Sequence, residues 1–424
     1  WSEEHNGIVK ATQTDFMYKG ECECLEVTYE DGRKTQFTPD HPILTSNNEW
    51  VKIKDLLVNE TRVKTSITNP LICIKDELKE CDNWSLEVGN MLLQTDTREE
   101  YLKTLAFVRI IGYILTDGSI KCMKRNYGNA YACCIFMGHM LDVYKIVEDI
   151  KLFVEIKQTN FVSKNVFMVN VPSMLVNNII QIPGLITGKR VNQNALLPEF
   201  ILDNKCPRPI IREFLAGLFG GDGHTCCLSQ HRSKRDVLTS ISFSQTKSFE
   251  QLESLTIMMD DIKMLLNKCG IHKITIQNFK ETTYSKKQNI KLGENKTAGN
   301  HQLTLHLDID ELIPFSEKIG FRYCCHKSQR LEGGVSYKRL RNEVTRQHNW
   351  LVNRVDEITK FTEIKKINPT KNVPTKKAII QAVNELKTRE GLLHEYAIPS
   401  THDITDHLIK GTTFGKFTSK SFPT

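Results

Sequence analysis

The stretch LAGLFGGDG, residues 215–223, closes an apolar run with glycines and a single aspartate. The run has the length and composition of a buried helix, and a glycine after the last helical residue is a common C-terminal signal. A second stretch, IIGYILTDG at residues 110–118, ends on the same Asp-Gly pair, so that Asp117 corresponds to Asp222. These two stretches predict the fold of the central part of the chain.

Small residues recur on one face of each predicted helix. Gly112 and Thr116 occupy the places that Gly217 and Gly221 occupy in the second stretch, four residues apart. Residues four apart share a helical face, and small side chains on that face let two helix backbones approach closely. If the two helices pack through these faces, the two aspartates lie side by side at the same end.

The segments after the two aspartates follow the same order, which indicates an internal repeat. After Asp117 come strand-like AYACCIFM, helix-like LDVYKIVEDI, strand-like NVFMVNV and a short helix from Ser173, and after Asp222 come VLTSISFS, a helix opened at Ser248 to Gln251, ITIQNF, LTLHLDI and a short helix around Leu312. The start of the first helix is predicted by a capping box at Thr97 and Glu100. Pro207 and Pro209 suit the first turn of the second helix.

The length of 424 residues predicts several domains, since about 150 residues per domain is usual. We expect an all-β domain over residues 1–95, in which Asp31-Gly32 forms a hairpin turn, and two α/β repeats over residues 96–200 and 201–335. Charged segments with a helical period predict a helical extension over residues 336–424.

Composition narrows the class of protein. The chain is 40% hydrophobic and 25% charged, as soluble globular proteins are, and we expect no membrane segment. The 13 cysteines form no CxxC pair, which predicts a reducing, intracellular setting and no zinc held by sulfur. A net charge of +7, from 57 Lys and Arg against 50 Asp and Glu, permits a nucleic-acid partner.

Two carboxylates at adjacent helix C-termini suggest a metal site. The helix dipole disfavours negative charge there, so a divalent cation would be needed to hold Asp117 and Asp222 together. Oxygen ligands with open water positions suit Mg²⁺ or Mn²⁺. Such an ion can activate water and stabilise the leaving oxygen of a phosphodiester. For either stretch taken alone, the simpler interpretation is a buried helix with a glycine cap.

The two stretches resemble the paired motifs of the LAGLIDADG family of homing endonucleases. That resemblance implies a monomer with a pseudo-twofold αββαββα repeat, in which Asp117 and Asp222 are the metal-binding catalytic acids. It also implies that paired β-sheets form a saddle over the major groove of a long double-stranded DNA target. Basic residues predicted to contact the DNA are Arg232, Lys234, Arg235, Lys280, Lys286, Lys287 and Lys291.

Two further blocks bear on the predicted site. FSEKIGFRYCCHKSQRL, residues 315–331, resembles a family block whose lysine assists the chemistry, here Lys327. The block before the second motif usually has the pattern Lys-x-Ile-Pro, but NALLPEF places Ala195 where that lysine is expected. Lys189 and Arg190 are the candidates to substitute for it.

The front of the chain resembles a different family block. TPDHPILT, residues 38–45, resembles the Thr-x-x-His block of the Hint domain of inteins. The resemblance implies that His41 promotes an acyl shift at a scissile peptide and that Thr38 orients it. The chain opens on Trp1 and ends on SFPT, so we expect a fragment truncated at both splicing ends that does not splice itself.

The predicted function is an intein segment with a site-specific homing endonuclease. SYKRLRNEVTRQHNWLVNRVDEI resembles the extension of long inteins in polymerase-type genes, which suggests the second-largest subunit of RNA polymerase II as host protein and a nuclear location. One alternative is a LAGLIDADG protein that binds DNA but has lost cleavage, which Ala195 favours. Others are a free-standing endonuclease like those that switch mating type, and a protein-processing element with a decayed nuclease.

Overall fold

The computed structural model describes residues 17, 20–58, 60–64, 74–125, 128–155, 159–163, 166–185, 187–188, 193–230, 236–279, 301–361 and 395–397. The chain divides into two compact units. The repeat unit holds the described residues of 67–227 and 238–334, and the flanking unit holds those of 13–66, 228–237 and 335–424.

The first half of the repeat unit is a helix followed by a four-stranded antiparallel sheet in the order β7-β8-β10-β9. Its elements are α2 (Arg98–Asp117), β7 (Gly118–Arg125), β8 (Gly128–Met137), α3 (Met140–Lys151), β9 (Thr159–Ser163), β10 (Val166–Val171) and α4 (Ser173–Ile179). Helices α3 and α4 pack on the sheet. Ahead of α2 lie α1 (Ile74–Cys81), β5 (Ser85–Val88) and β6 (Met91–Gln94).

The second half repeats this order, with a four-stranded antiparallel sheet β11-β14-β16-β15. Its elements are α6 (Arg208–Asp222), β11 (Gly223–His224), β14 (Ser242–Lys247), η3 (Phe249–Gln251), α7 (Leu252–Lys268), β15 (Ile274–Phe279), β16 (His301–Leu307), η4 (Ile309–Glu311) and α9 (Leu312–Lys318). The short helix α5 (Glu199–Leu202) precedes α6. The predicted pseudo-twofold α/β repeat therefore agrees with the observed order of elements.

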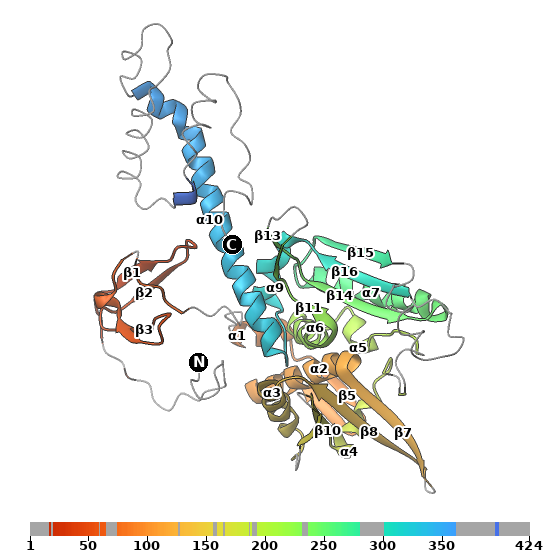
Figure 1. The fold of residues 1–424 in the computed structure, drawn as a ribbon. Coiled ribbons are helices and arrows are strands. Elements are labelled where there is room, and N and C mark those ends of the chain that lie inside the picture. The colour runs from red at the N-terminus through yellow and green to blue at the C-terminus, as the bar shows by residue number, and fades with distance from the viewer. Residues whose placement is uncertain are drawn as a thin grey trace. The chain divides into compact units, whose positions relative to one another are not determined.

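Helices α2 and α6 lie against each other between the two sheets (Figure 1). Their contact is backbone to backbone at the predicted glycines. A Cβ atom on Gly112 would lie 2.9 Å from the Leu218 amide nitrogen, and one on Gly217 would collide with the Arg109 carbonyl. Both α2 and α6 are buried along most of their length, as the apolar sequence predicts.

The flanking unit contains paired strands and part of a long helix. Its two-stranded sheets pair β1 (Leu25–Thr28) with β2 (Lys34–Phe37), β3 (Pro42–Leu44) with β4 (Trp50–Lys52), and β12 (Leu228–Gln230) with β13 (Asp236–Leu238). The predicted hairpin turn joins β1 to β2, and Gly32 has a φ of 82°, which favours glycine. The 3-10 helices η1 (Ile53–Asp55) and η6 (Glu395–Ala397) and most of α10 (Cys325–Phe361) also belong here.

The start signals predicted for α2 and α6 are observed, but the one predicted at Ser248 is not: α7 begins at Leu252, and its N-cap residue Gln251 makes no side-chain capping hydrogen bond. The Thr97 hydroxyl accepts a 3.2 Å hydrogen bond from the Glu100 amide, and Pro207 is the N-cap of α6. Strand β7, which follows Asp117 directly, was not predicted. Within the part of the chain that the structure describes, no helix combines the length and apolar character that a membrane span needs.

Candidate functional site

The two aspartates end the two central helices, and both are partly buried. A Cβ atom on Gly221, the residue before Asp222, would lie 3.1 Å from a carboxylate oxygen of Asp117. The small residue at this position therefore lets the Asp117 side chain reach the end of the opposite helix. The structure brings together the two acids that the sequence predicts as a pair.

Lys327 lies at the same end of α6. Its ammonium donates hydrogen bonds to the carbonyl oxygens of Gly220, at 2.6 Å, and of Gly221, and it lies 3.4 Å from that of Phe219. The Gly220 and Gly221 carbonyls belong to the last turn, where intrahelical donors run out, whereas the Phe219 carbonyl also accepts from the Gly223 amide. Burial lowers the pKa of Lys327, while Cys324, Asp117 and Asp222 oppose that shift. The predicted catalytic lysine is thus held beside both acids.

Gln245 contacts Asp222, although no sequence motif includes it. Its side-chain amide nitrogen donates a hydrogen bond to a carboxylate oxygen of Asp222. Gln245 lies on β14, whose register with β11 pairs Gly223 with Phe243. That register brings a residue 23 positions away in sequence to the acid. Gln245 directly follows the predicted strand VLTSISFS, and its residue type alone does not distinguish it from the other polar residues nearby.

Tyr113 supports Asp117 from inside the first helix. Burial raises the pKa of the Tyr113 phenol, and the charge of Asp117, to which it is hydrogen bonded, raises it further. The ring packs edge to face on Tyr323, with centroids 5.5 Å apart. The phenol therefore stays protonated and able to donate to the carboxylate.

A buried ion network fixes the helix pair behind the acids. Glu213 of α6, whose side chain is 3% exposed, pairs with Arg109 of α2 at 2.9 Å and with Arg322 at 2.8 Å. Burial opposes the charge on Glu213, but Arg322, Arg109 and Arg212 together hold its pKa well below the ordinary glutamate value. The Arg322 amide also donates to the Ala216 carbonyl at 2.9 Å, which anchors the segment leading to Lys327.

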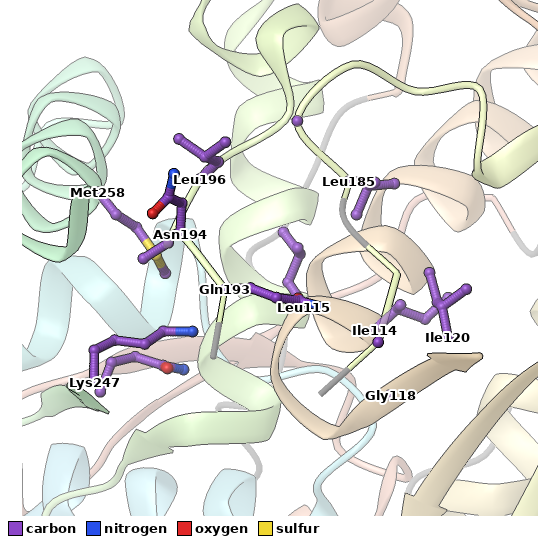
Figure 2. Close-up of a pocket in the computed structure, with 14 residues that line it drawn as sticks. Ile114, Leu115, Gly118, Ile120, Leu185, Gln193, Asn194, Leu196, Lys247 and Met258 are labelled. Carbon is purple, nitrogen blue, oxygen red and sulfur yellow. The ribbon is translucent and has the colours of Figure 1, made fainter. Parts of the chain in front are cut away.

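A pocket of about 590 Å³, counting the part open to solvent, lies at the end of α2 (Figure 2). Ile114, Leu115 and Gly118 form one side, and Gln245 and Lys247 of β14 belong to the lining. Ala195, where the family pattern has a lysine, also lines this pocket. The candidate substitutes Lys189 and Arg190 lie outside the described residues.

A helix of each half holds the segment that carries Ala195 or Cys325 by a backbone hydrogen bond. The Ala195 amide donates to the Ser254 hydroxyl at 3.0 Å, and the Cys325 amide donates to the Asp142 carboxylate at 2.7 Å. The Cys325 thiol also contacts Asp142. Ser254 belongs to α7 and Asp142 to α3, the corresponding helices of the two repeats.

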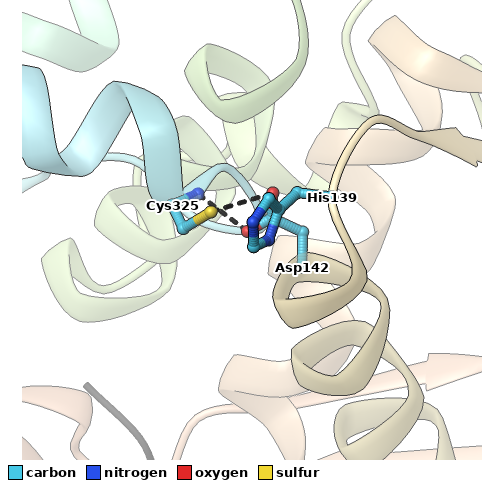
Figure 3. Close-up of side chains that lie close together, drawn as sticks. All are labelled: His139, Asp142 and Cys325. Carbon is cyan, nitrogen blue, oxygen red and sulfur yellow. Dashed lines mark hydrogen bonds between the residues drawn. The ribbon is translucent and has the colours of Figure 1, made fainter. Parts of the chain in front are cut away.

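A second cluster of metal-binding residue types lies at this last contact. Ligand atoms of His139, Asp142 and Cys325 lie within 4.8 Å of one another (Figure 3). The two carboxylate oxygens of Asp142 accept hydrogen bonds from the Cys325 amide and thiol. The His139 ring accepts a 3.2 Å hydrogen bond from the Leu141 amide. Capping of α3 and anchoring of the α10 start account for this geometry.

The remaining predicted site residues belong to the flanking unit or lie outside the described residues. Thr38 and His41 belong to the flanking unit, where the His41 amide donates to the Thr38 carbonyl at 3.0 Å. The His41 ring is exposed and its centroid lies 5.0 Å from that of Phe37. The predicted DNA-contacting residues Arg232, Lys234, Arg235, Lys280, Lys286, Lys287 and Lys291 lie outside the described residues.

The donor set at the helix ends fits the predicted metal. Carboxylate oxygens are the ligands that Mg²⁺ and Mn²⁺ prefer, and a bound phosphate and water can complete the coordination. Sulfur and imidazole, which favour softer ions, occur instead in the His139 cluster. The acid pair is therefore the better site for a hard cation.

Comparison with known proteins gives partial matches in sequence. No family model matches the chain. It is 25% identical over 279 residues to a tRNA-splicing ligase RtcB from Methanocaldococcus jannaschii, covering 59% of this chain and 27% of the ligase. It is 24% identical over 365 residues to a tRNA-splicing ligase RtcB from Pyrococcus abyssi, covering 81% of this chain and 36% of that protein. The chain thus spans about a quarter to a third of the length of these two relatives.

Among solved structures, the chain is similar to the homing endonuclease I-WcaI bound to its DNA recognition sequence, with a TM-score of 0.33, 16% identity and coverage of 58% of this chain and 86% of that one. It is also similar to the LAGLIDADG meganuclease I-AabMI bound to uncleaved DNA, with a TM-score of 0.32, 11% identity and coverage of 55% and 90%. These values are too low to carry the function of those structures to this chain.

Proposed function

We propose that the repeat unit is a site-specific double-strand DNA endonuclease that hydrolyses phosphodiester bonds with Mg²⁺ or Mn²⁺. One observation carries the proposal: α2 and α6, in contact through glycines, bring Asp117 and Asp222 to one end beside the ammonium of Lys327. Two acids and a buried cation on a rigid helix pair suit a reaction in which negative charge develops on phosphate oxygens.

Each residue has a distinct task in this reaction. A bound divalent ion would lower the pKa of water and stabilise charge on the phosphate. Asp117 and Asp222 would hold it, with Tyr113 and Gln245 orienting the two carboxylates. Lys327, fixed by the carbonyls of Gly220 and Gly221, places a positive charge beside the site. Water adds to phosphorus as the bond to the leaving oxygen breaks, and that oxygen takes up a proton.

The alternative is a protein of the same fold that binds DNA without cutting it. Ala195 favours this alternative, because the block before α6 lacks the lysine of the family pattern. The retained acid pair and Lys327 favour cleavage. Binding and cleavage must therefore be measured separately.

We also propose that the flanking unit retains part of a Hint domain and that the repeat unit is inserted in a host protein. The β1-β2 and β3-β4 hairpins and the Thr38–His41 turn support the first part. Matches confined to part of a longer relative are what an inserted element would give. An RNA polymerase II subunit as host finds no support in the comparisons.

The Hint proposal has a direct test. A fusion that places a host peptide and a cysteine-initiated segment ahead of Trp1 should release the peptide on addition of a thiol, and His41→Ala should prevent release. Absence of release from the parent fusion would remove this part of the proposal.

The endonuclease test begins with binding. Duplexes are recovered from random-sequence DNA by binding to the protein in EDTA, and the uninterrupted genes of a tRNA-splicing ligase and of the polymerase subunit are added as candidate targets. End-labelled versions of the bound duplexes are then incubated with Mg²⁺ and the protein, and both strands are followed on denaturing gels.

We expect cleavage of both strands at a fixed position. Asp117→Asn and Asp222→Asn should each slow it by about 10²-fold or more. Asp260→Asn, a change of an exposed acid on α7, serves as the matched control and should cut at the wild-type rate. Specific binding with no cutting in Mg²⁺ or Mn²⁺ would replace the endonuclease by the DNA-binding alternative.

A further inference from the structure

The ends of the two central helices correspond residue by residue. Asp222 and Asp117 are 105 positions apart (222 − 117). The same shift relates Phe219 and Gly220, whose carbonyls lie next to the Lys327 ammonium, to Ile114 and Leu115. The Lys327 ammonium lies beside Phe219 and Gly220 of α6, so the corresponding place in the first half lies beside Ile114 and Leu115 of α2.

At that position, beside the end of α2, lies the pocket shown in Figure 2. Ile114, Leu115 and Gly118 form its helix side, and Ala195 lines it from the segment before α6. Because alanine ends at Cβ, it leaves open the volume that a longer side chain would fill. At the α6 end the corresponding place is filled by the Lys327 ammonium. At the α2 end the described part of the segment that carries Ala195 provides no such cation.

Lys247 enters this pocket from the other half. It is the last residue of β14 and is 6% exposed, and Figure 2 shows its side chain extending into the pocket lined by Leu115 and Asn194. Among the described residues that line the pocket, Lys247 carries the only charge. Gln245, two residues earlier on the same face of the strand, donates to Asp222 and links this pocket to the acid pair.

We propose that Lys247 takes the place of the lysine missing at position 195, and that its ammonium binds a DNA phosphate oxygen beside the acid pair at the α2 end. A cation is then present on each side of the two acids: Lys327 at the end of α6 and Lys247 at the end of α2. This role of Lys247 rests on the proposed endonuclease. Lys247 belongs to the second half of the repeat unit but would act at the helix end of the first half.

The test measures the cleavage rate of each DNA strand separately. On a duplex labelled on either strand, Lys247→Met should slow cleavage of one strand by about 10²-fold and leave the other near the wild-type rate, so that nicked DNA accumulates. The double variant Lys247→Met with Ala195→Lys should restore the slow strand to within about tenfold of wild type, because a lysine at 195 fills the same pocket. Lys327→Met should slow the opposite strand.

A matched control addresses folding. The amine of Lys268 on α7 is also buried, and it lies outside the pocket. Lys268→Met should leave both strands cut at equal rates, and the melting temperature of each variant shows whether it is folded. Equal slowing of both strands by Lys247→Met, or no rescue by Ala195→Lys in a folded double variant, would overturn the proposal.

Binding gives a readout that does not depend on cleavage. With DNA and no divalent ion, Lys247→Met should reduce the slope of log affinity against log salt by about one, as expected for one lost phosphate contact. If the wild type binds and does not cut, the endonuclease proposal fails, and an unchanged slope then rejects the phosphate contact of Lys247 as well. A reduced slope keeps that contact in a protein that only binds DNA.

Discussion

The C-terminal ends of α2 and α6 share an Asp-Gly pair but differ in the residues that lie against them. At the α6 end, Lys327 comes from the chain that follows in the same half and bonds to the last carbonyls. At the α2 end, the corresponding segment offers Ala195, and Lys247 enters from the opposite sheet. A repeat can therefore keep its backbone geometry while the lysines beside its two helix ends come from different segments of the chain.

The buried ion network behind the acids is where α2 and α6 differ most. Glu213 of α6 corresponds to Val108 of α2, and both are buried. Glu213→Gln should lower the free energy of unfolding by about 3–5 kcal/mol at neutral pH, because three arginines lose their buried counter-charge. Val108→Ala, a large-to-small change at the matching position, should show a loss that does not depend on pH.

The sign of the pH effect follows from the lowered pKa of Glu213. A carboxyl with a lowered pKa stabilises the fold above its unfolded pKa of about 4.5, and that contribution disappears as pH falls. The stability difference between wild type and Glu213→Gln should therefore shrink below about pH 4.5 in urea titrations. A constant difference down to pH 3 would contradict the ion network as its source.

The cation at the α6 end is tested by Lys327→Met, which should reduce the cleavage rate by about 10²- to 10³-fold. Burial lowers the pKa of Lys327, so wild-type cleavage should decline on the alkaline side at a lower pH than an ordinary lysine would give. Lys327→Arg should move that decline to higher pH, because arginine stays protonated. Lys318→Met is the control, since Lys318 also donates to a carbonyl, that of Gly270, away from the acids.

The close approach of the two helices is tested at Gly217. Gly217→Ala places a methyl group against the Arg109 carbonyl and should cost about 1–3 kcal/mol of stability despite the better helix propensity of alanine. Gly138, whose added Cβ would meet no atom within 4 Å, provides the matched control. Thermal melts that rank Gly138→Ala as equally destabilised would argue against backbone contact between the helices.

The smallest expected effect concerns the contacts that hold the loops of the two halves. Ser254→Ala and Asp142→Ala remove the acceptors of the Ala195 and Cys325 amides, and each should cost about 1 kcal/mol. Asp142→Ala should also weaken cleavage, because Cys325 lies two residues before Lys327. Melting temperature and single-turnover cleavage measured on the same samples separate these two consequences.

The sequence predicted the central architecture because helical period, caps and the repeated Asp-Gly pair are local signals. The ends of α2 at Asp117 and of α6 at Asp222, and the order of elements in each half, follow from them. Strand β7 was missed because its GSIKCMKR sequence mixes charged and apolar residues without a clear alternation.

The rest of the site depends on register between distant strands, which no local pattern encodes. Gln245 and Lys247 reach the acids and the pocket only because β14 pairs with β11 and β16 in one register. Their residue types alone gave no reason to select them from the other polar residues of the second half. Ala195, by contrast, was found as a departure from a known pattern, and the structure locates it in the pocket.

The glycine contact between α2 and α6 also means that the acid pair belongs to neither half of the repeat unit alone. Asp117 and Asp222 come from segments joined only by the chain between α4 and α6. Two separately produced polypeptides, divided between α4 and α5, would each carry one of the two aspartates, and the pair would form only on their association. Because both halves belong to one chain, the two aspartates are always produced in equal amounts and on linked segments.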